Sequence, residues 1–537
     1  MLRYGLVIHD GPIPAWQSQA IDYLRVVPDS QCVVVLVRSE AAARKSLATW
    51  VSDGFAVLDR TVFPSKRDPM ANTDVSAQLR EVPHRALAAG WHPDDGLVLI
   101  INLTALPIAG EGPAAPATAT MSNAPGPALP VGIWSLGFGP SLHGDSAAVG
   151  LSEVVVHADT AQSALVARFA DGTATVLYQS YAPTHEVSVN LSRALVLWKS
   201  ATFFARALHQ ANSKDRAPAQ QPAQRAQAAG AQHHVPLSAA SIVVGLSRQC
   251  ARFAWQRATH RWQPEKWTMA YRVDPPSRSN DEPCTTLDKL TWLLPPRDRF
   301  WADPFVVRDS QSWYVFFEES IRGLRRAHLC GMRIDEHGPC ELPFRIMERD
   351  FHLSYPFVFT WQGTWWMVPE TSRNQTVELW RADNFPRQWK LERVLLQGVS
   401  AVDATLHEHD GRWWMFCNLA EPGASSNDEL AIFHAPSPLG PWQPHRRNPI
   451  RSDVRNTRPA GRIFQRDGAW IRPAQNCAGR YGSSIVLQRM DRLDVDDYHE
   501  TPIGEIVPNA AQGQTGVHTI NAAAGLTIFD VRRRVAR

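Results

Sequence analysis

Acidic and amide residues recur at matching positions in the second half of this 537-residue chain. The stretch 303–319, DPFVVRDSQSWYVFFEE, aligns without a gap on 355–371, YPFVFTWQGTWWMVPET, and similar stretches begin at 403, 460 and 517. The first column of this alignment holds Asp303, Tyr355 and Asp403, and the second holds Glu318, Glu370, Asn418 and Gln475. Carboxyl groups gathered at one site are the groups that general acid–base catalysis uses. The columns therefore predict a polar site, with turn hydrogen bonds at strand ends as the alternative.

Basic residues gather in the last two repeats. They are Arg458, Arg462, Arg472 and Arg480 in the fourth repeat and His518 at the start of the fifth. Arginine forks bind phosphate or carboxylate through two hydrogen bonds. The cluster predicts an anionic ligand, such as a sugar phosphate, a sugar nucleotide or an acidic sugar. The alternative is that each arginine pairs with a nearby acid, for example Asp453, Asp467 or Glu370.

The repeat itself predicts the element that positions these residues. Each unit of about 50 residues reads as a strand, a polar turn and an aromatic strand, and five such units describe an all-β, five-bladed β-propeller over 260–537. The segment WTMAYRV at 267–273 is expected to complete the last blade and so remove the exposed sheet edges. In a propeller the innermost strands line the central channel, which places both columns at one mouth. A β-sandwich is the alternative architecture.

The first part of the chain has a different pattern. Residues 1–212 alternate short apolar runs with helical stretches such as 192–209, which predicts an α/β layer fold. The segment 107–130 is a Pro/Ala/Gly-rich loop. Residues 213–237 have almost no large apolar side chain and are expected to be a linker, followed by a helix near 239–257, so that 213–259 joins the two domains.

Composition excludes several classes of function. A net charge of +3 and a pI near 8.5 are too balanced to indicate binding to nucleic acid or to a membrane surface. Seven cysteines, an odd number without metal-ligand spacing, favour a reducing compartment and indicate no metal. We see no signal peptide and no apolar run long enough for a transmembrane segment, so we expect a cytoplasmic protein. Nothing indicates a cofactor, and oligomeric state is not indicated either.

The blade motifs DRFWADPF, LSYPFVF, VPETS, AVDATL, RPAGR, RPAQNCAGRYG and HTIN carry a family resemblance. They resemble the five-bladed propeller glycosidases of the arabinanase/xylosidase type. More specifically, 260–535 looks like the propeller in the N-terminal region of plant glucosamine inositolphosphorylceramide transferases. In the plant enzymes the transferase domain proper is a separate C-terminal module, and nothing corresponding follows here.

The resemblance implies roles for particular residues. Propeller glycosidases use a carboxylate base, a carboxyl acid and a third carboxylate that tunes the acid. Asp303 matches the base, Asp403 matches a later aspartate, and Glu370 or Glu318 is expected as the acid. Tyr355 replaces an expected aspartate, and RPAGR replaces a motif with a glutamate, so ordinary hydrolysis is less favoured. The expected substrate-binding residues are Trp301, Glu318, Tyr355, Asn418, Arg458, Arg462, Arg472, Gln475, Arg480 and His518.

The first domain resembles the formyltransferase fold of methionyl-tRNA and sugar formyltransferases, a Rossmann-type fold, over roughly 1–210. The resemblance implies an N-x-H motif, but the corresponding stretch reads Trp134-Ser135-Leu136, with His143 and Asp145 at shifted positions. We therefore expect a domain that does not transfer formyl groups.

Three functions compete. The leading prediction is a carbohydrate-active enzyme for glycosyl transfer in cytoplasmic steps of cell-surface glycan or glycolipid assembly. Its ligand would be an anionic sugar or sugar nucleotide. The alternatives are an intracellular glycoside hydrolase and a non-catalytic protein that binds a glycan or nucleotide sugar.

Overall fold

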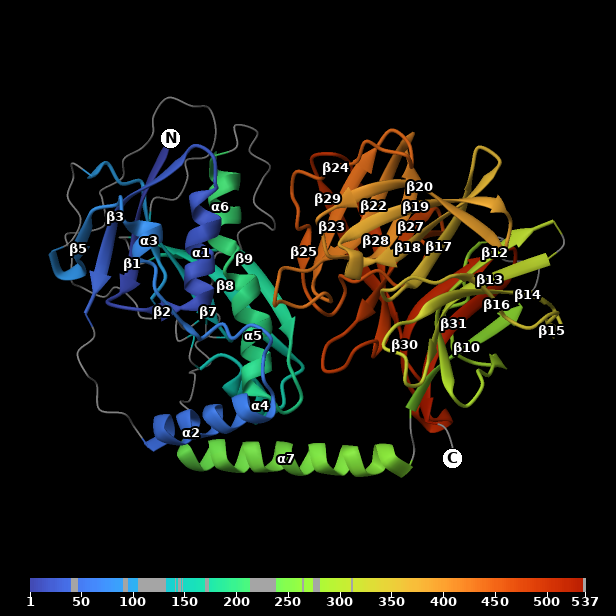
Figure 1. Ribbon diagram of the computed structural model, residues 1–537, viewed down its shortest axis with the longest axis horizontal. Helices are drawn as coiled ribbons and strands as arrows, with labels where there is room; N and C mark the ends of the chain where they lie inside the picture. The colour runs from blue at the N-terminus through green and yellow to red at the C-terminus, as the bar shows by residue number, and fades with distance from the viewer. Residues whose placement is uncertain are drawn as a thin grey trace. The chain divides into compact units, whose positions relative to one another are not determined.

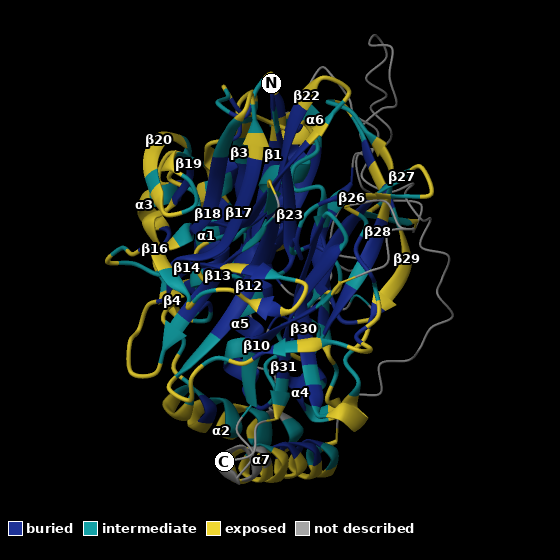
Figure 2. Cartoon of the chain, turned by 90° about the vertical axis from the view of Figure 1, so that its right-hand side faces the viewer, coloured by how far each residue is buried: buried dark blue, intermediate teal, exposed yellow. Residues whose placement is uncertain are grey.

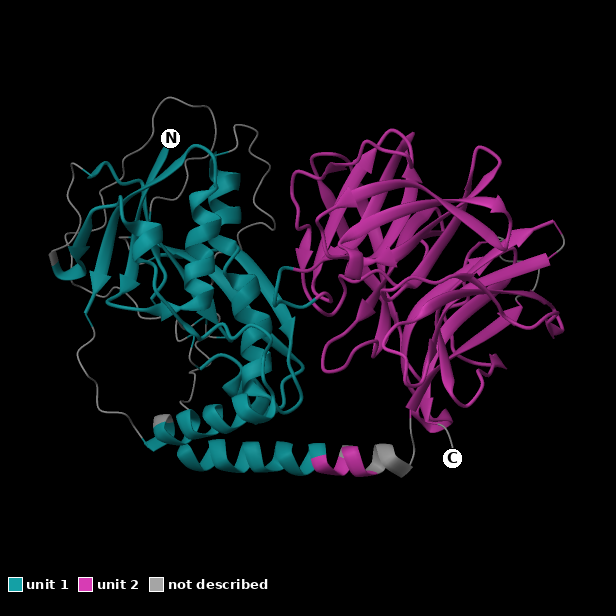
Figure 3. Ribbon diagram, viewed as in Figure 1, with its two compact units in different colours: residues 1–253, 421–425 teal, residues 254–420, 426–537 magenta. Residues whose placement is uncertain are grey.

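The computed structural model describes residues 1–39, 47–89, 95–104, 132–140, 142, 146, 148–169, 173–212, 238–262, 265–273, 281–310 and 312–534. The expected linker 213–237, the loop 107–130, His143 and Asp145 lie outside these residues. The chain forms two compact units, Met1–Phe253 with Glu421–Ser425, and Ala254–Ala420 with Ser426–Arg537 (Figure 3). The division falls within a helix that the sequence predicted near 239–257, α7 (Ala239–Trp262).

The first unit is built on a seven-stranded mixed sheet in the order β5-β3-β1-β6-β7-β8-β9 (Figure 1). Its strands are β1 (Leu2–His9), β3 (Ser30–Arg38), β5 (His84–Ala86), β6 (Leu99–Asn102), β7 (Ile133–Phe138), β8 (Thr160–Arg168) and β9 (Ala174–Pro183). Neighbouring strands pair in parallel from β5 through β3, β1 and β6 to β7. The pairs β7–β8 and β8–β9 are antiparallel. Its longer helices are α1 (Ala15–Arg25), α2 (Leu47–Val62), α4 (Leu151–Val156), α5 (Val189–Ser200) and α6 (Phe203–Asn212).

Both faces of this sheet are buried, as its apolar strands predict. Tyr4, Leu6 and Ile8 of β1 join one core cluster, whereas Val7 joins another on the opposite face. Alternate side chains of a strand point to opposite faces, so a strand that is apolar on both needs cover on both sides. The α/β layer architecture is confirmed. The narrower resemblance to formyltransferases stays a prediction.

The second unit contains five antiparallel sheets, which are the five blades of a β-propeller (Figure 1). Blade 1 contains β12 (Arg299–Asp309), β13 (Ser312–Ile321), β14 (His328–Asp335), β15 (Gly338–Pro339) and β16 (Phe344–Met347). Blade 2 contains β17 (Ser354–Trp361), β18 (Thr364–Thr371), β19 (Thr376–Asn384) and β20 (Gln388–Gln397). Blade 3 contains β21 (Ala401–His409), β22 (Arg412–Leu419), β23 (Glu429–Ala435), β24 (Gln443–Pro444) and β25 (Arg451–Ser452). Blade 4 contains β26 (Phe464–Arg466), β27 (Ala469–Asn476), β28 (Ser484–Leu493) and β29 (Tyr498–Ile506).

Blade 5 closes the ring with strands from both ends of the propeller sequence. Strands β30 (Gln514–Ala523) and β31 (Leu526–Arg534) are joined by β10 (Glu265–Val273) and β11 (Thr291–Leu293). β10 pairs with β31 along its whole length, from Glu265 opposite Arg534 to Val273 opposite Leu526. The predicted role of 267–273 is confirmed. This pairing removes an edge that would otherwise offer unpaired backbone groups.

The aromatic side chains of the repeat fill the blades. Trp313, Trp365, Trp413 and Trp470 each occupy the second residue of β13, β18, β22 and β27. Figure 2 shows that the strands are largely buried, while the exposed residues lie at turns, outer strands and helix faces. Within the part of the chain that the structure describes, no helix is both long and apolar enough to span a bilayer.

Candidate functional site

The first column of the repeat coincides with a break in three innermost strands. The strand register skips two residues between Ala302 and Phe305, between Ser354 and Phe357, and between Val402 and Thr405. The first skipped residue has a positive φ in each case: +49° at Asp303, +45° at Tyr355 and +56° at Asp403. A side chain in this region costs roughly 1–2 kcal/mol, and such strain concentrates at functional sites. The bulges turn these three side chains away from the ordinary strand direction.

The fifth blade has a break of the same kind, and it brings His518 to Asp303. The register of β30 with β31 skips from Val517 to Ile520, so His518 and Thr519 lie in the bulge. Nε2 of His518 lies 3.1 Å from Oδ1 of Asp303, and the Thr519 hydroxyl donates to the same oxygen over 2.9 Å. Nδ1 of His518 lies 2.8 Å from Oδ1 of Asp530 as an ion pair. Asp530 also accepts the backbone N–H of Asp303 over 2.9 Å.

This arrangement sets the charge of both partners. Burial alone would lower the pKa of His518, but the carboxylates of Asp530 and Asp303 raise it to about 10. Burial alone would raise the pKa of Asp303, but the charge of His518 and hydrogen bonds from His518 and Thr519 lower it below its usual value. Asp303 is therefore an ionised carboxylate, although only 4% of the residue is exposed.

Asp403 is held by a second network. Nε and Nη2 of Arg458 donate to its two carboxylate oxygens over 2.6 and 3.2 Å, and the Gln475 amide donates over 2.9 Å. Nη1 of Arg458 donates to Asn427 over 2.6 Å. Burial raises the pKa of Asp403 to about 6, against the opposing charge of Arg458. Both carboxylate oxygens of Asp403 accept hydrogen bonds, so this residue is suited to act on the site through its charge.

Glu318 and Glu370 come from the second column, as predicted. Glu318 lies opposite Ala302 in the strand register, and Glu370 lies opposite Ser354. Glu370 accepts the backbone N–H of Ser372 over 2.7 Å and the Ser354 hydroxyl over 3.3 Å. Burial, reinforced by the charge of Asp303, raises the pKa of Glu318 well above its usual value. The protonated form of its carboxyl group is therefore favoured, and Nε2 of His352 lies 3.6 Å from its Oε1.

These groups form one electrostatic cluster. The charge of Asp303 raises the pKa of both Glu318 and Asp403, and Glu370 acts on the same two residues. The half-buried Tyr481 lies between the two networks, because Arg458 lies 5.1 Å from its ring and His518 lies 5.2 Å from it. The structure thus brings together the three predicted catalytic residues with Glu318, Arg458, Gln475 and His518.

Tyr355 supports the cluster. Its hydroxyl lies 2.8 Å from the Thr405 hydroxyl and accepts the backbone N–H of Gly461 over 2.8 Å. The side chain is fully buried and joins three blades. Gly461 has a φ of +127°, and a Cβ there would lie 1.9 Å from the Ile520 carbonyl oxygen, so only glycine fits. The Asn418 amide, in the second column, lies 3.3 Å from Thr457 Oγ1.

The other predicted arginines do not join the cluster. Arg472 donates twice to Glu500 over 2.8 Å and also binds backbone carbonyls of Asn456 and Thr457. Arg480 pairs with Glu265 at 2.5 Å. Arg462 donates to the Val358 carbonyl over 2.5 Å and lies against Phe357. The predicted gathering of four arginines thus reduces to Arg458, because the strand register sends the others to partners within the blades.

Trp301 also differs from its predicted role in sugar stacking. It packs on Phe317 with 5.2 Å between ring centroids, and its Nε1 donates to Glu319 over 2.9 Å. Only 7% of the residue is exposed, so neither ring face is offered to a ligand.

Sequence reasoning missed Asp530, Thr519 and Tyr481. Asp530 lies opposite the bulge of β30, where the equivalent residues of blades 1 and 3 are Phe317 and Cys417. An acid in an apolar strand, IFDVR, at a position that other blades fill with an uncharged residue is a signal that the repeat alignment could have used. Tyr481 lies in a loop and carries no signal from the repeat.

Two groups of side chains have the composition of a cation site among the described residues. They are Asp303 with His518 and Asp530, and Glu319 with His328 and Cys330; in each group the ligand atoms lie within 4.8 Å of one another. His518 is already paired with both of its carboxylates. Arg299 lies 3.2 Å from Glu319, so its charge opposes a cation in the second group.

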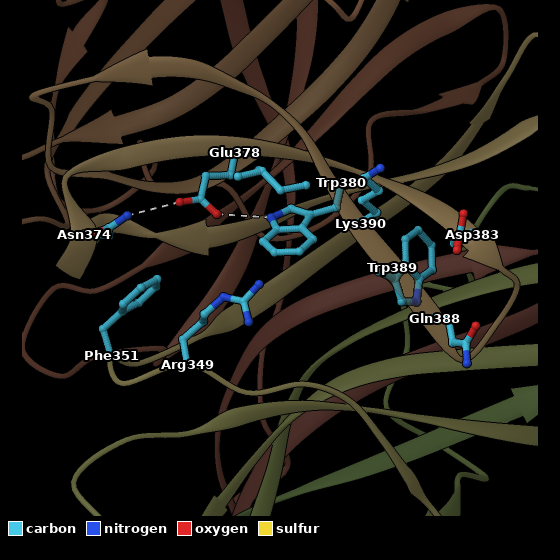
Figure 4. Close-up of a pocket in the computed structure, with 10 residues that line it drawn as sticks. Arg349, Phe351, Asn374, Glu378, Trp380, Asp383, Gln388, Trp389 and Lys390 are labelled. Carbon is cyan, nitrogen blue, oxygen red and sulfur yellow. Dashed lines mark hydrogen bonds between the residues drawn. The ribbon is translucent and has the colours of Figure 1, made fainter.

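A pocket of about 730 Å³ lies on the outer strands of blade 2 (Figure 4). None of the carboxyl groups of the cluster at the strand bulges lines it. Glu378 accepts hydrogen bonds there from Asn374 and from Nε1 of Trp380. The guanidinium of Arg349 lies 4.6 Å from the Trp380 ring and covers it. Glu378, Asn374 and Trp380 thus bind one another, and the cluster at the strand bulges, which gathers several carboxyl groups, is the better candidate for chemistry.

One family model matches part of the chain, within the propeller. Residues 283–525 match the family model described as "Glucosamine inositolphosphorylceramide transferase 1, N-terminal". Glucosamine inositolphosphorylceramide transferase 1 of Oryza sativa subsp. japonica is 35% identical over 219 residues, which cover 40% of this chain and 29% of that protein. The Arabidopsis thaliana protein of the same name is 35% identical over 208 residues, covering 38% and 27%. The matched region thus spans less than a third of these relatives.

Solved structures similar to part of the chain include glycoside hydrolases. One is a family 117 glycoside hydrolase of the marine bacterium Zobellia galactanivorans, with 12% identity, a TM-score of 0.33, and 50% of this chain and 90% of that chain covered. Another is the catalytic domain of a Coprinopsis cinerea family 62 α-L-arabinofuranosidase, with 12% identity, a TM-score of 0.32, and 50% and 96% covered.

Proposed function

We propose that the propeller transfers a glycosyl unit by general acid–base catalysis. One observation carries the proposal: Asp303 and Glu318 share one buried cluster, yet their surroundings move their pKa values in opposite directions. A pair of carboxyl groups driven apart in this way supplies a base and an acid at the same pH. Cleavage of a glycosidic bond requires these two groups.

Each group has a distinct task in this proposal. The ionised Asp303 accepts the proton of the attacking hydroxyl, and the protonated Glu318 donates its proton to the departing glycosidic oxygen. The bond from the sugar carbon to the leaving oxygen breaks as the bond to the attacking oxygen forms. Asp403, held by Arg458 and Gln475, and Glu370 provide negative charge that favours the positive sugar in the transition state.

The role of Glu318 and the charges around it indicate which kind of glycosyl donor the site would use. Protonation by Glu318 assists a poor leaving group, such as a sugar or lipid alkoxide, more than a nucleoside diphosphate. The charges near the bulges are mostly negative, and Arg458 is already paired with Asp403. We therefore favour a neutral glycosyl donor. Transfer from an anionic nucleotide sugar, which the sequence suggested, is the second candidate and rests on Arg458 as its cation.

The acceptor is proposed from the relatives. The names of the matched plant proteins refer to transfer of glucosamine to inositolphosphorylceramide, which suggests glycolipid or surface-glycan assembly for this chain. With water as acceptor the same groups would hydrolyse the donor. Without turnover the protein would be a glycan-binding module. The cytoplasmic location remains a proposal that rests on the odd number of cysteines.

One experiment separates these possibilities. The protein is incubated with a panel of aryl glycosides and nucleotide sugars, with and without glycolipid acceptors, and each product is quantified. A glycosylated acceptor supports transfer, free sugar alone indicates hydrolysis, and released nucleotide identifies an activated donor. Binding of sugars without any product would contradict an enzymatic role.

A further inference from the structure

Helix α2 and helix α7, which belongs to the first unit as far as Phe253, expose an unusual amount of apolar surface. Eight of the nineteen strongly exposed large apolar side chains in the described part of the chain lie on α2 and α7. On α2 they are Leu47, Trp50, Val57, Leu58 and Val62, and on α7 they are Val243, Val244 and Trp255. Their exposed fractions run from 48% at Val244 to 72% at Leu47 and Trp255. Exposed apolar side chains gathered on two neighbouring helices indicate an interaction site.

Other side chains of the same two helices are well packed. Val51 and Phe55 of α2 and Ile242 and Leu246 of α7 share one cluster with α4 and α5. Phe253 of α7 lies 6.0 Å from the Phe63 ring, just after the end of α2. Figures 1 and 2 both show the two helices side by side, with exposed residues along α7 in Figure 2. The exposed stripes therefore belong to helices that the unit holds in place.

The charge of α7 narrows the choice of partner. The helix sequence, AASIVVGLSRQCARFAWQRATHRW, contains four arginines and no acid. Arg248 and Arg252 are exposed on the helix that also exposes Val244 and Trp255. A positively charged helix that also exposes a tryptophan and valines is typical of helices that lie in the interface of an anionic membrane.

Other occupants fit less well. A second copy of this chain would bring the same arginines together and repel. The preceding segment 213–237 carries Lys214, Arg216 and Arg225 against the single acid Asp215, so it does not complement the helix either. We propose that α2 and α7 form a docking surface for an anionic lipid bilayer, with apolar side chains entering the interface and arginines contacting the headgroups.

The surface can be tested with vesicles. The full-length protein is sedimented with vesicles of phosphatidylcholine alone or with one third phosphatidylglycerol, at low and high salt. We expect binding to the anionic vesicles that weakens as salt rises, because salt screens the arginines. The double variant Arg248→Glu/Arg252→Glu should lower this binding at least about tenfold. Trp255→Ser should also lower it, through the loss of buried apolar area.

Matched variants control for charge and exposure. Arg325→Glu/Arg333→Glu changes the same charge on exposed propeller residues, and Leu342→Ser removes a side chain that is 87% exposed. Both should bind vesicles as the unchanged protein does, and circular dichroism verifies that all variants fold. Equal binding by all variants, or no binding by the unchanged protein, would overturn the proposal. A concentration-dependent dimer that Trp255→Ser abolishes, without vesicle binding, would assign the surface to a second copy instead.

Discussion

Asp303 and His518 come from different blades, yet they meet as a buried ion pair with 3.1 Å between Oδ1 and Nε2. Both residues lie in strand bulges, at β12 and at β30. Asp530 pairs with the other ring nitrogen, Nδ1, so the histidine stays charged and Asp303 stays ionised. Because Asp303 lies in blade 1 and His518 in blade 5, closing the propeller ring brings together the pair that keeps the proposed base ionised.

The pair predicts a loss of stability at alkaline pH. The pKa of His518 is about 10 in the folded protein, against about 6.5 when unfolded, so its contribution is complete below pH 6.5 and is lost as pH rises through 10. We expect the free energy of unfolding to fall by on the order of 5 kcal/mol over this range, since each pKa unit corresponds to about 1.4 kcal/mol. Denaturant titrations of the unchanged protein and of His518→Gln should converge as pH rises. Parallel curves would contradict the assignment.

Glu318→Gln should remove the proposed proton donor without harming the fold. The glutamine keeps the size of a side chain that is already neutral, so we expect little change in the midpoint of denaturation. Turnover should fall roughly 10²–10⁴-fold for donors with poor leaving groups. Aryl glycosides with acidic phenol leaving groups should be much less affected, since they need no proton. A uniform loss for all donors would argue against a role in protonation.

The neighbouring Glu319→Gln provides the matched comparison. Glu319 accepts from Trp301, lies 3.0 Å from His328 and is 3.2 Å from Arg299. Despite burial, hydrogen bonds from His328 and Trp301 and the charge of Arg299 lower its pKa to about 2. The stability that ionised Glu319 contributes to the folded protein is present above pH 4.5 and is lost as pH falls through 2. At neutral pH the variant should lose about 2–3 kcal/mol of stability and keep the kcat of the remaining folded enzyme.

Arg458→Gln should destabilise the propeller by leaving Asp403 buried without its cation. Removing one partner of a buried ion pair typically costs about 3–5 kcal/mol. The second change in Arg458→Gln/Asp403→Asn should restore much of this loss, and a double-mutant cycle measures the coupling. Arg480→Gln breaks a more exposed pair with Glu265 and should cost below about 1 kcal/mol. Equal losses in the two single variants would contradict the buried role of Arg458.

The periodic parts of the structure could be predicted from the sequence. The repeat fixed the blade count, the place of Trp365, Trp413 and Trp470, and the closing strand, because blades recur with the sequence period. The two columns were also visible, since equivalent residues of a repeat occupy equivalent places.

The partners of long side chains could not be predicted in the same way. Arg462, Arg472 and Arg480 lie near Arg458 in sequence, but their guanidinium groups end at Val358, Glu500 and Glu265. An arginine side chain is long enough to reach any one of several neighbouring residues. Strand register and the paths of the loops therefore decide which residue it binds. Asp530 was missed for a related reason: its role depends on a bulge in the opposite strand, which no local pattern records.

The most direct test of the proposed chemistry is the turnover of Asp303→Asn. The substitution keeps the size of the side chain and removes the charge and the basic oxygen, so the account predicts a folded protein whose turnover falls at least about 10²-fold. Asp309→Asn, at the far end of the same strand, is the control and should keep full turnover. Both are assayed on the donor and acceptor found in the product screen, beside the unchanged protein. Full turnover by Asp303→Asn would contradict the assignment of Asp303 as the catalytic base.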